Sequence, residues 1–420
     1  MKVCVIGAGC TGITAIKNLL EVGITNVVCY EKNDAIGGNW IYTAQEGHSS
    51  VCETTHIISS KTLSAYRDFP MPNDYPDYPS HRQVLDYFRS YAEHFGIYPY
   101  IKFNTAVEKV EKIENERWKV TLSTGEVNEF DQLMIANGHH SVPIHPTFAK
   151  DFTGDYHHSH SFKNNKGYED KRVLVVGAGN SACDCAVEIS RVAQHVGMSM
   201  RSGQYIIPKF IMGQPADVVN LRVLFLPMWL RNILLKISLR LQIGKYEDYQ
   251  LPVPNFPVTK AHPTMNSELL YKIRHGAVHP RKGVEKIQGK TITFSDGTSE
   301  EYDTLVAATG YHITFPFFDK NFINYENSER IELYLRMLHP EHPTLFFMGL
   351  VQPQGCVWPI SDWQAKLVAQ SLVGRSKLPK NIAQLAKQEA DQVATDFHAA
   401  KRHAVEVHYH SFIAKVKKHL

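Results

Sequence analysis

The sequence predicts an α/β protein built from two similar units, and three observations support this. Two short apolar runs, Lys2–Ile6 and Arg172–Val176, each lead into a glycine-rich turn and then into a segment with helical apolar spacing. Each unit closes with a hairpin-like pattern that ends in a glycine. The two intervals, Gly7 to Gly138 and Gly177 to Gly310, are nearly equal in length. Two segments of one length and one plan indicate two α/β domains with parallel sheets.

Composition agrees with such a fold and excludes several classes of protein. The 420 residues are enough for two domains, and 43% apolar with 21% charged residues is ordinary for a globular protein. The formal net charge of +3 is too small to indicate a nucleic-acid partner. We expect no metal site. The first residues show no signal-peptide pattern, so a cytoplasmic protein is expected.

The seven cysteines point to a core of reduced thiols. They are odd in number, lie mostly in predicted strands or helices, and show no CxxC or CxxxxC spacing. This disfavours a disulfide reductase. Cys183 and Cys185 form a CxC pair at a predicted helix start, where packing is favoured over redox chemistry.

The first turn, GAGCTG, has the spacing of a dinucleotide-binding fingerprint. Gly7 permits the tight turn, Gly9 lets the backbone approach a pyrophosphate, and Gly12 lets helix Ile13–Leu20 pack closely on the strand. The pyrophosphate then faces a helix N-terminus with its free N–H groups.

Two further features of this half favour FAD as its ligand. The next strand ends in Glu31, near the position after the turn at which this fold places an acid that binds a ribose diol. The segment IGGNW, residues 36–40, then offers a glycine backbone beside an aromatic ring, which suits a flat ring system.

The second turn, GAGNSA, repeats the fingerprint with Gly177, Gly179 and Ala182. The following strand, expected near Met198–Met200, ends in Arg201 and Ser202. Arg201 is as far along the chain from its glycine turn as Glu31 is from the first one. An arginine can pair with a 2′-phosphate through its planar fork, whereas an acid would repel it. This half is therefore predicted to bind NADP(H).

The fold prediction is thus two Rossmann-like domains, with an FAD domain discontinuous around an NADP(H) domain. Residues 1–165 and 306–420 form the FAD domain and its C-terminal helices, and residues 166–305 form the NADP(H) domain. A helix is predicted over residues 81–95, with Gly96 as its stop. The tail from Asn381 is expected to be helical and to pack on the first domain.

The stretch LRVLFLPMWLRNILLKISLRLQIG, residues 221–244, is apolar but contains four basic residues and a proline. A transmembrane span is therefore not expected. An amphipathic helix is expected instead, and three roles stay open: a core helix, a cover over the substrate site, or a membrane-surface helix.

Together these residues resemble the flavin-containing monooxygenases, class B flavoprotein monooxygenases, nearly from end to end. Besides the two turns and EKNDAIGGNW, the segment FTGDYHHSHSF matches the family pattern FxGxxxHxxx(Y/F) at Phe152, Gly154, His158 and Phe162. ANGHH, AATGY and QPQGCVWPIS also look like family motifs. The resemblance implies that NADPH reduces FAD and that the reduced flavin adds dioxygen at C4a. A small sulfur or nitrogen nucleophile would then attack this hydroperoxide.

The resemblance and the turns give the candidate binding residues. For FAD they are Gly7, Gly9, Cys10, Thr11, Gly12, Glu31, Lys32, Gly38, Asn39, Trp40, Val107 and Gln352. For NADP(H) they are Gly177, Gly179, Asn180, Ser181, Ala182, Arg201 and Ser202. The expected partners are a small-molecule substrate and O2, with a homodimer as one possible assembly.

One departure from the family leaves the reaction open. The asparagine that the family carries beside the flavin falls on Ile58, which cannot donate a hydrogen bond. Ser59, or His56 in a shifted register, is the candidate substitute. Baeyer–Villiger oxidation or oxidative decarboxylation of a carbonyl substrate is therefore an alternative, and so is an NAD(P)H oxidase that releases hydrogen peroxide.

Overall fold

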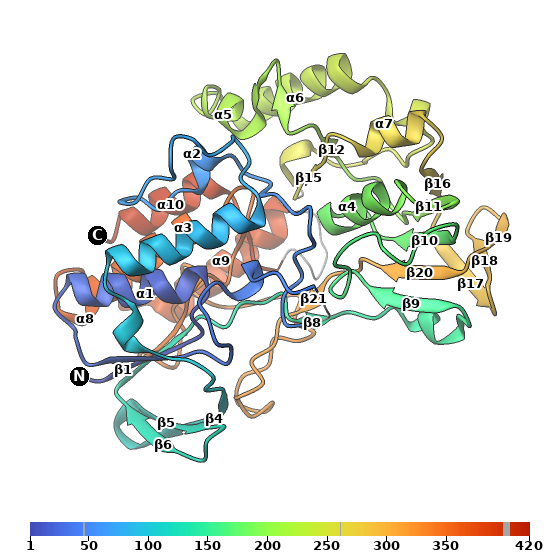
Figure 1. The fold of residues 1–420 in the computed structure, drawn as a ribbon. Helices are drawn as coiled ribbons and strands as arrows, with labels where there is room; N and C mark the ends of the chain where they lie inside the picture. The colour runs from blue at the N-terminus through green and yellow to red at the C-terminus, as the bar shows by residue number, and fades with distance from the viewer. Residues whose placement is uncertain (45–46, 261, 398–403) are drawn as a thin grey trace. The chain divides into compact units, whose positions relative to one another are not determined.

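The computed structural model describes the whole chain except residues 45–46, 261 and 398–403, and the chain divides into two compact units. The first comprises residues 1–41, 59–142 and 312–420, and the second comprises residues 42–58 and 143–311. The second unit is thus inserted into the first, and many elements of both are labelled in Figure 1.

The first unit is built on a five-stranded parallel sheet in the order β22-β7-β1-β2-β3. Its central strands are buried along almost their whole length, since helices cover sheets of this kind on both faces. The strands are β1 (Val3–Ile6), β2 (Val27–Tyr30), β3 (Ile101–Lys102), β7 (Gln132–Ile135) and β22 (Leu345–Phe347).

In the first unit α1 packs against α8 and α3 (Figure 1). α3 begins where the sequence predicts, because Ser80 and Gln83 form a capping box, and Phe95 and Gly96 end it. α10 packs on α8, as expected of the tail in its described part. The helices are α1 (Cys10–Glu21), α2 (Lys61–Ser64), α3 (His81–His94), α8 (Val357–Leu372), α9 (Ile382–Asp396) and α10 (Tyr409–Lys417).

Each unit also contains a three-stranded antiparallel sheet, which includes the predicted hairpin-like pair; it follows β3 in the first unit and β16 in the second. In the first unit Trp118 and Phe130 from this sheet join the buried core. The strands are β4 (Val107–Ile113), β5 (Arg117–Leu122) and β6 (Val127–Phe130), and then β17 (Val284–Gln288), β18 (Thr291–Phe294) and β19 (Ser299–Glu301).

The second unit has a parallel sheet in the order β16-β11-β10-β20-β9, in which the glycine-turn strand again lies at the centre. β11 ends at Ser199, one residue earlier than predicted, and the Met200 amide makes the last bond of its pairing with β16, to the Arg281 carbonyl at 3.0 Å. The elements are β9 (Asp155–His158), β10 (Arg172–Val176), β11 (His195–Ser199), β16 (His279–Arg281), β20 (Thr304–Ala307), α4 (Asn180–Ile189) and α7 (Leu269–Arg274).

Residues 143–165, which the sequence analysis places with the first domain, lie in the second unit. β9 pairs in parallel with β20, from Asp155 opposite Thr304 to His158 opposite Ala307. Because β9 comes before the glycine turn of its own sheet in the chain, its membership could not be recognised from the repeat.

The apolar stretch 221–244 follows a short helix, α5 (Ala216–Leu221), and forms most of a second one, α6 (Met228–Ile243), with Pro227 between them. α6 contacts the core of the second unit through one face, where Leu239 is buried and Leu235 and Ile243 pack beside it. Among the described residues no helix has both the length and the apolar character needed to cross a membrane. The remaining strands are two-residue segments: β8 (Val142–Pro143), β12 (Ile206–Ile207), β13 (Phe210–Ile211), β14 (Gln214–Pro215), β15 (Thr264–Met265), β21 (Tyr311–His312), β23 (Gln352–Pro353) and β24 (Glu406–Val407).

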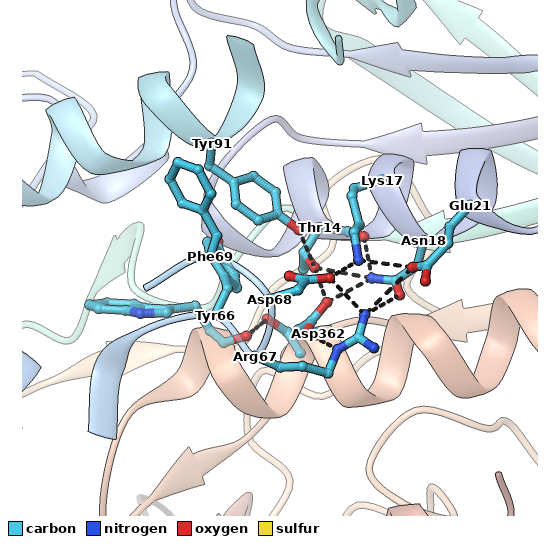
Figure 2. A network of polar contacts seen from close by, with 12 residues as sticks. Thr14, Lys17, Asn18, Glu21, Tyr66, Arg67, Asp68, Phe69, Tyr91 and Asp362 are labelled. Atoms are coloured by element: carbon cyan, nitrogen blue, oxygen red, sulfur yellow. Dashed lines mark hydrogen bonds and ion pairs between the residues drawn. The ribbon is translucent and has the colours of Figure 1, made fainter. Parts of the chain in front are cut away.

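A buried carboxylate joins the helices of the first unit (Figure 2). Asp362 on α8 is fully buried and accepts hydrogen bonds from the Thr14 hydroxyl and the Asn18 amide of α1, each at 2.7 Å. Its second oxygen accepts from Arg67 Nε at 2.9 Å. A buried carboxylate is tolerated only when donors surround it in this way.

A second ion pair continues the same network (Figure 2). Lys17 of α1 is almost fully buried and pairs with Glu21 at 2.8 Å and with Asp68. The segment Tyr66–Asp68 is thereby held against α1 and α8, and the Tyr66 hydroxyl donates to the Cys10 carbonyl at 2.5 Å. The first turn of α1 is thus fixed from the side chains as well as from its own backbone.

We predict that Asp362→Asn lowers the free energy of unfolding by about 3 kcal/mol, since it leaves Arg67 without its buried partner and turns an amide toward two donors. Thermal unfolding followed by circular dichroism measures the change. Asp391→Asn is the control, because Asp391 is exposed beside Arg330 and its ion pair contributes little. Equal melting temperatures for both variants would contradict the assigned role of Asp362.

Candidate nucleotide-binding sites

The first glycine turn lies at the carboxyl end of β1, next to β7, where the strand order reverses. Gly7 has φ of +98°, which a side chain would strain. A Cβ on Gly12 would lie 1.9 Å from the Gly7 carbonyl oxygen, so only glycine allows α1 to approach the strand. α1 then begins without a side-chain cap or an acidic residue in its first turn, which leaves its N–H groups open to an anion.

Glu31 lies directly after β2, buried beside the turn. One carboxylate oxygen accepts from the Ala8 amide at 2.7 Å, and the other accepts from the amide and the side chain of Asn33. The Thr105 amide donates to the Glu31 carbonyl at 2.9 Å. This bond brings the start of β4, with Val107, close to Glu31, while the Lys32 side chain is exposed.

The IGGNW segment folds back onto the same turn. The Gly37 amide donates to the Ala8 carbonyl at 3.1 Å, and a Cβ on Gly38 would lie 3.2 Å from the Gly9 Cα. Gly38, Asn39 and Trp40 form a short 3-10 helix, in which the Trp40 ring meets the Trp358 ring edge to face at 5.5 Å. The backbones of Gly9 and Gly38 therefore lie against each other, close to the ring of Trp40.

His139 and Gln352 follow the carboxyl ends of β7 and β22. Gln352 is one of the predicted site residues, and His139 is not. The His139 ring faces the Gln352 side chain, and burial lowers the pKa of His139 from its ordinary value to about 4. A small hollow there is lined by Asn137, His139 and Gly349, among others. The ANGHH motif directly after a strand was the available signal for His139.

These features fit a dinucleotide with a flat ring. The first unit offers a glycine cradle that any Cβ would obstruct, an uncapped helix N-terminus, and a buried carboxylate at the ribose position of this fold. Cys10 and Thr11 form the first residues of that helix, and Thr11 is mostly buried.

The second glycine turn repeats this geometry at the end of β10. Gly177 has φ of +145°, and a Cβ there would lie 2.4 Å from the Ala308 carbonyl oxygen. Ala182 packs below it, fully buried, while a Cβ on Gly179 would meet open space. Asn180 is held in place because its side-chain oxygen accepts from the Met265 amide at 2.8 Å, and Ser181 is exposed.

Arg201 and Ser202 are both exposed after β11, at the carboxyl edge of this sheet. The Arg201 side chain packs against Gly283, and within the described chain it forms no ion pair. Lys282, which sequence reasoning missed, follows the neighbouring strand β16 and is exposed too; its carbonyl accepts from the Ser199 hydroxyl at 2.7 Å. Two basic side chains thus lie after adjacent parallel strands.

Arg281 is next in the chain to Lys282 but is already neutralised. It pairs with Glu300, and although burial opposes ionisation, the hydrogen bonds from Arg281 and Tyr302 lower the pKa of Glu300 to about 2. Arg201 and Lys282 are therefore the cations at this edge that form no salt bridge among the described residues.

His158 and the other residues of the FxGxxxHxxx(Y/F) pattern pack inside the second unit. Phe152, His158 and Phe162 are buried, and a Cβ on Gly154 would lie 2.4 Å from the Asp303 carbonyl oxygen. Burial, with His145 and His160 nearby, lowers the pKa of His158 to about 4. The His160 amide donates to His158 Nδ1 at 3.1 Å, so the ring is held neutral.

Comparison with known proteins identifies the family of this chain. The model of the family "Flavin-binding monooxygenase-like" matches residues 1–420. The chain belongs to this family. Flavin-containing monooxygenase 5 of Rattus norvegicus is 33% identical over 437 residues, covering 97% of this chain and 80% of the relative. Dimethylaniline monooxygenase [N-oxide-forming] 2 of the same species is 34% identical over 409 residues, covering 92% and 76%.

A solved structure agrees with the fold. S-allyl-L-cysteine S-oxygenase from Allium sativum superimposes with a TM-score of 0.74 at 21% identity, covering 100% of this chain and 88% of that one. The predicted fold class, the predicted family and the predicted class of FAD-dependent oxidoreductase are confirmed.

The two residues predicted to act in place of Ile58, Ser59 and His56, have different surroundings in the structure. The Ser59 hydroxyl is buried and lies 2.8 Å from the Ser64 hydroxyl, so it is engaged within the first unit. His56 is exposed, with Nδ1 2.9 Å from the Thr54 carbonyl. Ile58 itself is partly exposed. The two candidates belong to different compact units, since the boundary falls between Ile58 and Ser59.

We predict that Gly12→Ala abolishes flavin retention, because the added Cβ collides with the Gly7 carbonyl and pushes α1 off its strand at a cost of about 1–3 kcal/mol. The ratio of flavin to protein absorbance after purification measures this. Gly179→Ala is the matched control in the second turn, where the Cβ meets open space. Flavin content at the wild-type level in Gly12→Ala would show that this contact is not required.

Proposed function

We propose that this protein is an NADPH- and O2-dependent flavin monooxygenase that oxygenates small soft nucleophiles at sulfur or nitrogen. One observation carries the proposal: the strand that follows each glycine-turn helix leads into a different residue, the buried carboxylate of Glu31 and the exposed guanidinium of Arg201. An acid selects a ribose diol, and a base selects a phosphorylated ribose. The names of the Rattus norvegicus N-oxide-forming relative and of the Allium sativum S-oxygenase support the substrate class.

The first unit would hold FAD. Gly7, Gly9 and the first N–H groups of α1 would receive the pyrophosphate, Glu31 the ribose, and Val107 the adenine side of the nucleotide. Gly38, Asn39 and Trp40 would line the flavin end, with Gln352 and His139 at the strand ends opposite. When bound there and reduced by NADPH, the flavin supplies the activation of dioxygen.

The second unit would hold NADP(H). Gly177, Gly179 and the start of α4 would receive the pyrophosphate, with Ser181 as an added donor. Arg201 would bind the 2′-phosphate as a planar fork, with Ser202 as a hydroxyl donor and Lys282 as a second positive charge. Asn180 accepts from the Met265 amide through its side-chain oxygen, and its side-chain NH2 would donate to the nucleotide.

We predict that Arg201→Ala raises the Michaelis constant for NADPH about ten-fold, since a charge-assisted contact to phosphate is lost. Lys282→Ala should raise it less, and neither change should alter the constant for NADH. Steady-state oxidation of each nucleotide gives these values. Arg222→Ala, at an exposed arginine on another element, is the control. A Michaelis constant for NADPH that stayed unchanged in Arg201→Ala would rule out the 2′-phosphate assignment.

Ile58 favours a second candidate, in which NADPH is oxidised with release of hydrogen peroxide. A side chain without a donor at this position offers no hydrogen bond to an oxygen held beside the flavin. The Ser59 hydroxyl is already engaged with Ser64. A carbonyl substrate, converted by Baeyer–Villiger oxidation or oxidative decarboxylation, is a third candidate motivated by the same residue.

The partition between product and peroxide decides among these functions. With a thioether, a tertiary amine and a ketone offered in turn, we expect oxygenated product from the thioether or the amine, in proportion to the NADPH consumed. Ile58→Asn should raise the product-to-peroxide ratio, and Ile58→Val is the control for size. Peroxide equal to NADPH with every substrate would establish the oxidase, and product from the ketone alone would establish carbonyl oxidation.

A further inference from the structure

The second glycine turn is held on one side by a strand that comes much later in the chain. β15 pairs in parallel with β12 and contacts α4, all within the second unit (Figure 1). The three consecutive residues Thr264, Met265 and Asn266 each form a hydrogen bond to the turn or to α4. We call these residues the 264–266 segment.

Thr264 acts on the turn itself. It is almost fully buried, and its hydroxyl donates to the carbonyl of Ala178, the middle residue of the turn, at 2.8 Å. The C=O and N–H groups of a planar trans peptide point in opposite directions, so the Gly179 N–H of the same peptide points away from Thr264. Thr264 therefore fixes the direction of a donor that a pyrophosphate would use at the start of α4.

The first glycine turn has the same arrangement with a different donor. The carbonyl of its middle residue, Ala8, accepts from the Gly37 amide at 3.1 Å. In both units, then, the carbonyl at the middle of the turn is engaged by a donor from outside it. The donor is a backbone amide in the first unit and the Thr264 hydroxyl in the second. A substitution can remove the hydroxyl without changing the backbone.

Met265 and Asn266 contact α4 at positions one helical turn apart. Because a backbone N–H can only donate, the Asn180 atom that faces the Met265 amide at 2.8 Å is the side-chain oxygen, and the Asn180 NH2 group is turned away from β15. Asn266 donates to Asp184 Oδ1 at 2.9 Å. Its own side-chain oxygen accepts from two backbone amides at the start of α7, which fixes the NH2 group toward Asp184.

We propose that Thr264 and Asn266 are positioning residues for dinucleotide binding in the second unit. Through the Ala178 carbonyl and Asp184 they hold the turn and the start of α4 in the conformation that receives the pyrophosphate. The inference rests on the proposed nucleotide site of this unit. Since NADP(H) and NAD(H) both contain a pyrophosphate, the 264–266 segment sets the affinity for both nucleotides, whereas Arg201 acts on the 2′-phosphate alone.

Isothermal titration of the FAD-loaded protein with NADP+ and with NAD+ tests the proposal. Thr264→Val removes the hydroxyl with little change of volume, and we expect it to raise both dissociation constants about five-fold. Thr264→Ser keeps the hydroxyl and should bind close to the wild-type level. Thr304→Val is the matched control, because Thr304 is fully buried in β20 and its hydroxyl has no hydrogen-bond partner among the described residues.

A charge exchange tests Asn266. Asn266→Asp brings a carboxylate against Asp184 and should weaken the binding of both nucleotides about ten-fold, since like charges repel across this contact. Adding Asp184→Asn should recover much of the loss, because an amide again donates to a carboxylate. In steady-state turnover, Thr264→Val should raise the Michaelis constant for NADPH and leave kcat unchanged, which a general loss of folded enzyme would not do.

Unchanged dissociation constants in Thr264→Val would overturn the proposal, as would equal losses in Thr264→Val and Thr304→Val. Flavin content and melting temperature are measured on every variant, and should Thr264→Val fail to fold, the Asn266 exchange decides. Wild-type protein that bound NAD+ as tightly as NADP+ would instead overturn the proposed 2′-phosphate recognition, and the Thr264 comparison would still be decisive. Binding of neither nucleotide would overturn both.

Discussion

The contact between Gly12 and the Gly7 carbonyl is the constraint on which the first unit depends. Without a side chain at position 12, α1 approaches β1 closely enough for its first N–H groups to lie at the end of the strand. Buried polar contacts of neighbouring side chains also hold the helix in this position. Asp362 and Lys17 join α1 to α8 and to the segment Tyr66–Asp68 through buried polar contacts, which are directional where apolar packing is not.

The second unit repeats this plan with Ala182 in the place of Gly12, and in the proposed function the two units bind different ligands. The glycine turn and helix N-terminus recognise only a pyrophosphate, which is common to many dinucleotides. Selectivity is left to residues at the ends of neighbouring strands, where a single change of charge does not disturb the fold. Glu31 is buried and hydrogen-bonded by the Ala8 amide, whereas Arg201 is exposed and packs on Gly283.

The parts of the fold that could be predicted from the sequence are those governed by local rules. The glycine turns, the capping box of α3 and the equal spacing from each turn to Glu31 or Arg201 are set by backbone geometry within one strand–helix unit. β9 could not be placed, because its partner β20 comes only at the far end of the inserted unit and no turn motif precedes β9. Lys282 could not be predicted as a binding residue, because it lies near Arg201 only when β16 pairs with β11. In α6 both faces are apolar, so the pattern could not tell which one would be buried.

The position of β22 in the chain has a consequence for folding during synthesis on the ribosome. β22 completes the sheet of the first unit, but the chain reaches it only at Leu345, after the last strand of the second unit's parallel sheet has ended at Ala307. The inserted unit therefore has all its parallel strands available while β7 of the first unit still has an unpaired edge. Domains usually fold in the order in which they are synthesised. Here the first unit begins earlier in the chain but completes its sheet later than the second. Until β22 is synthesised, the open edge of β7 is exposed to pairing with a wrong strand.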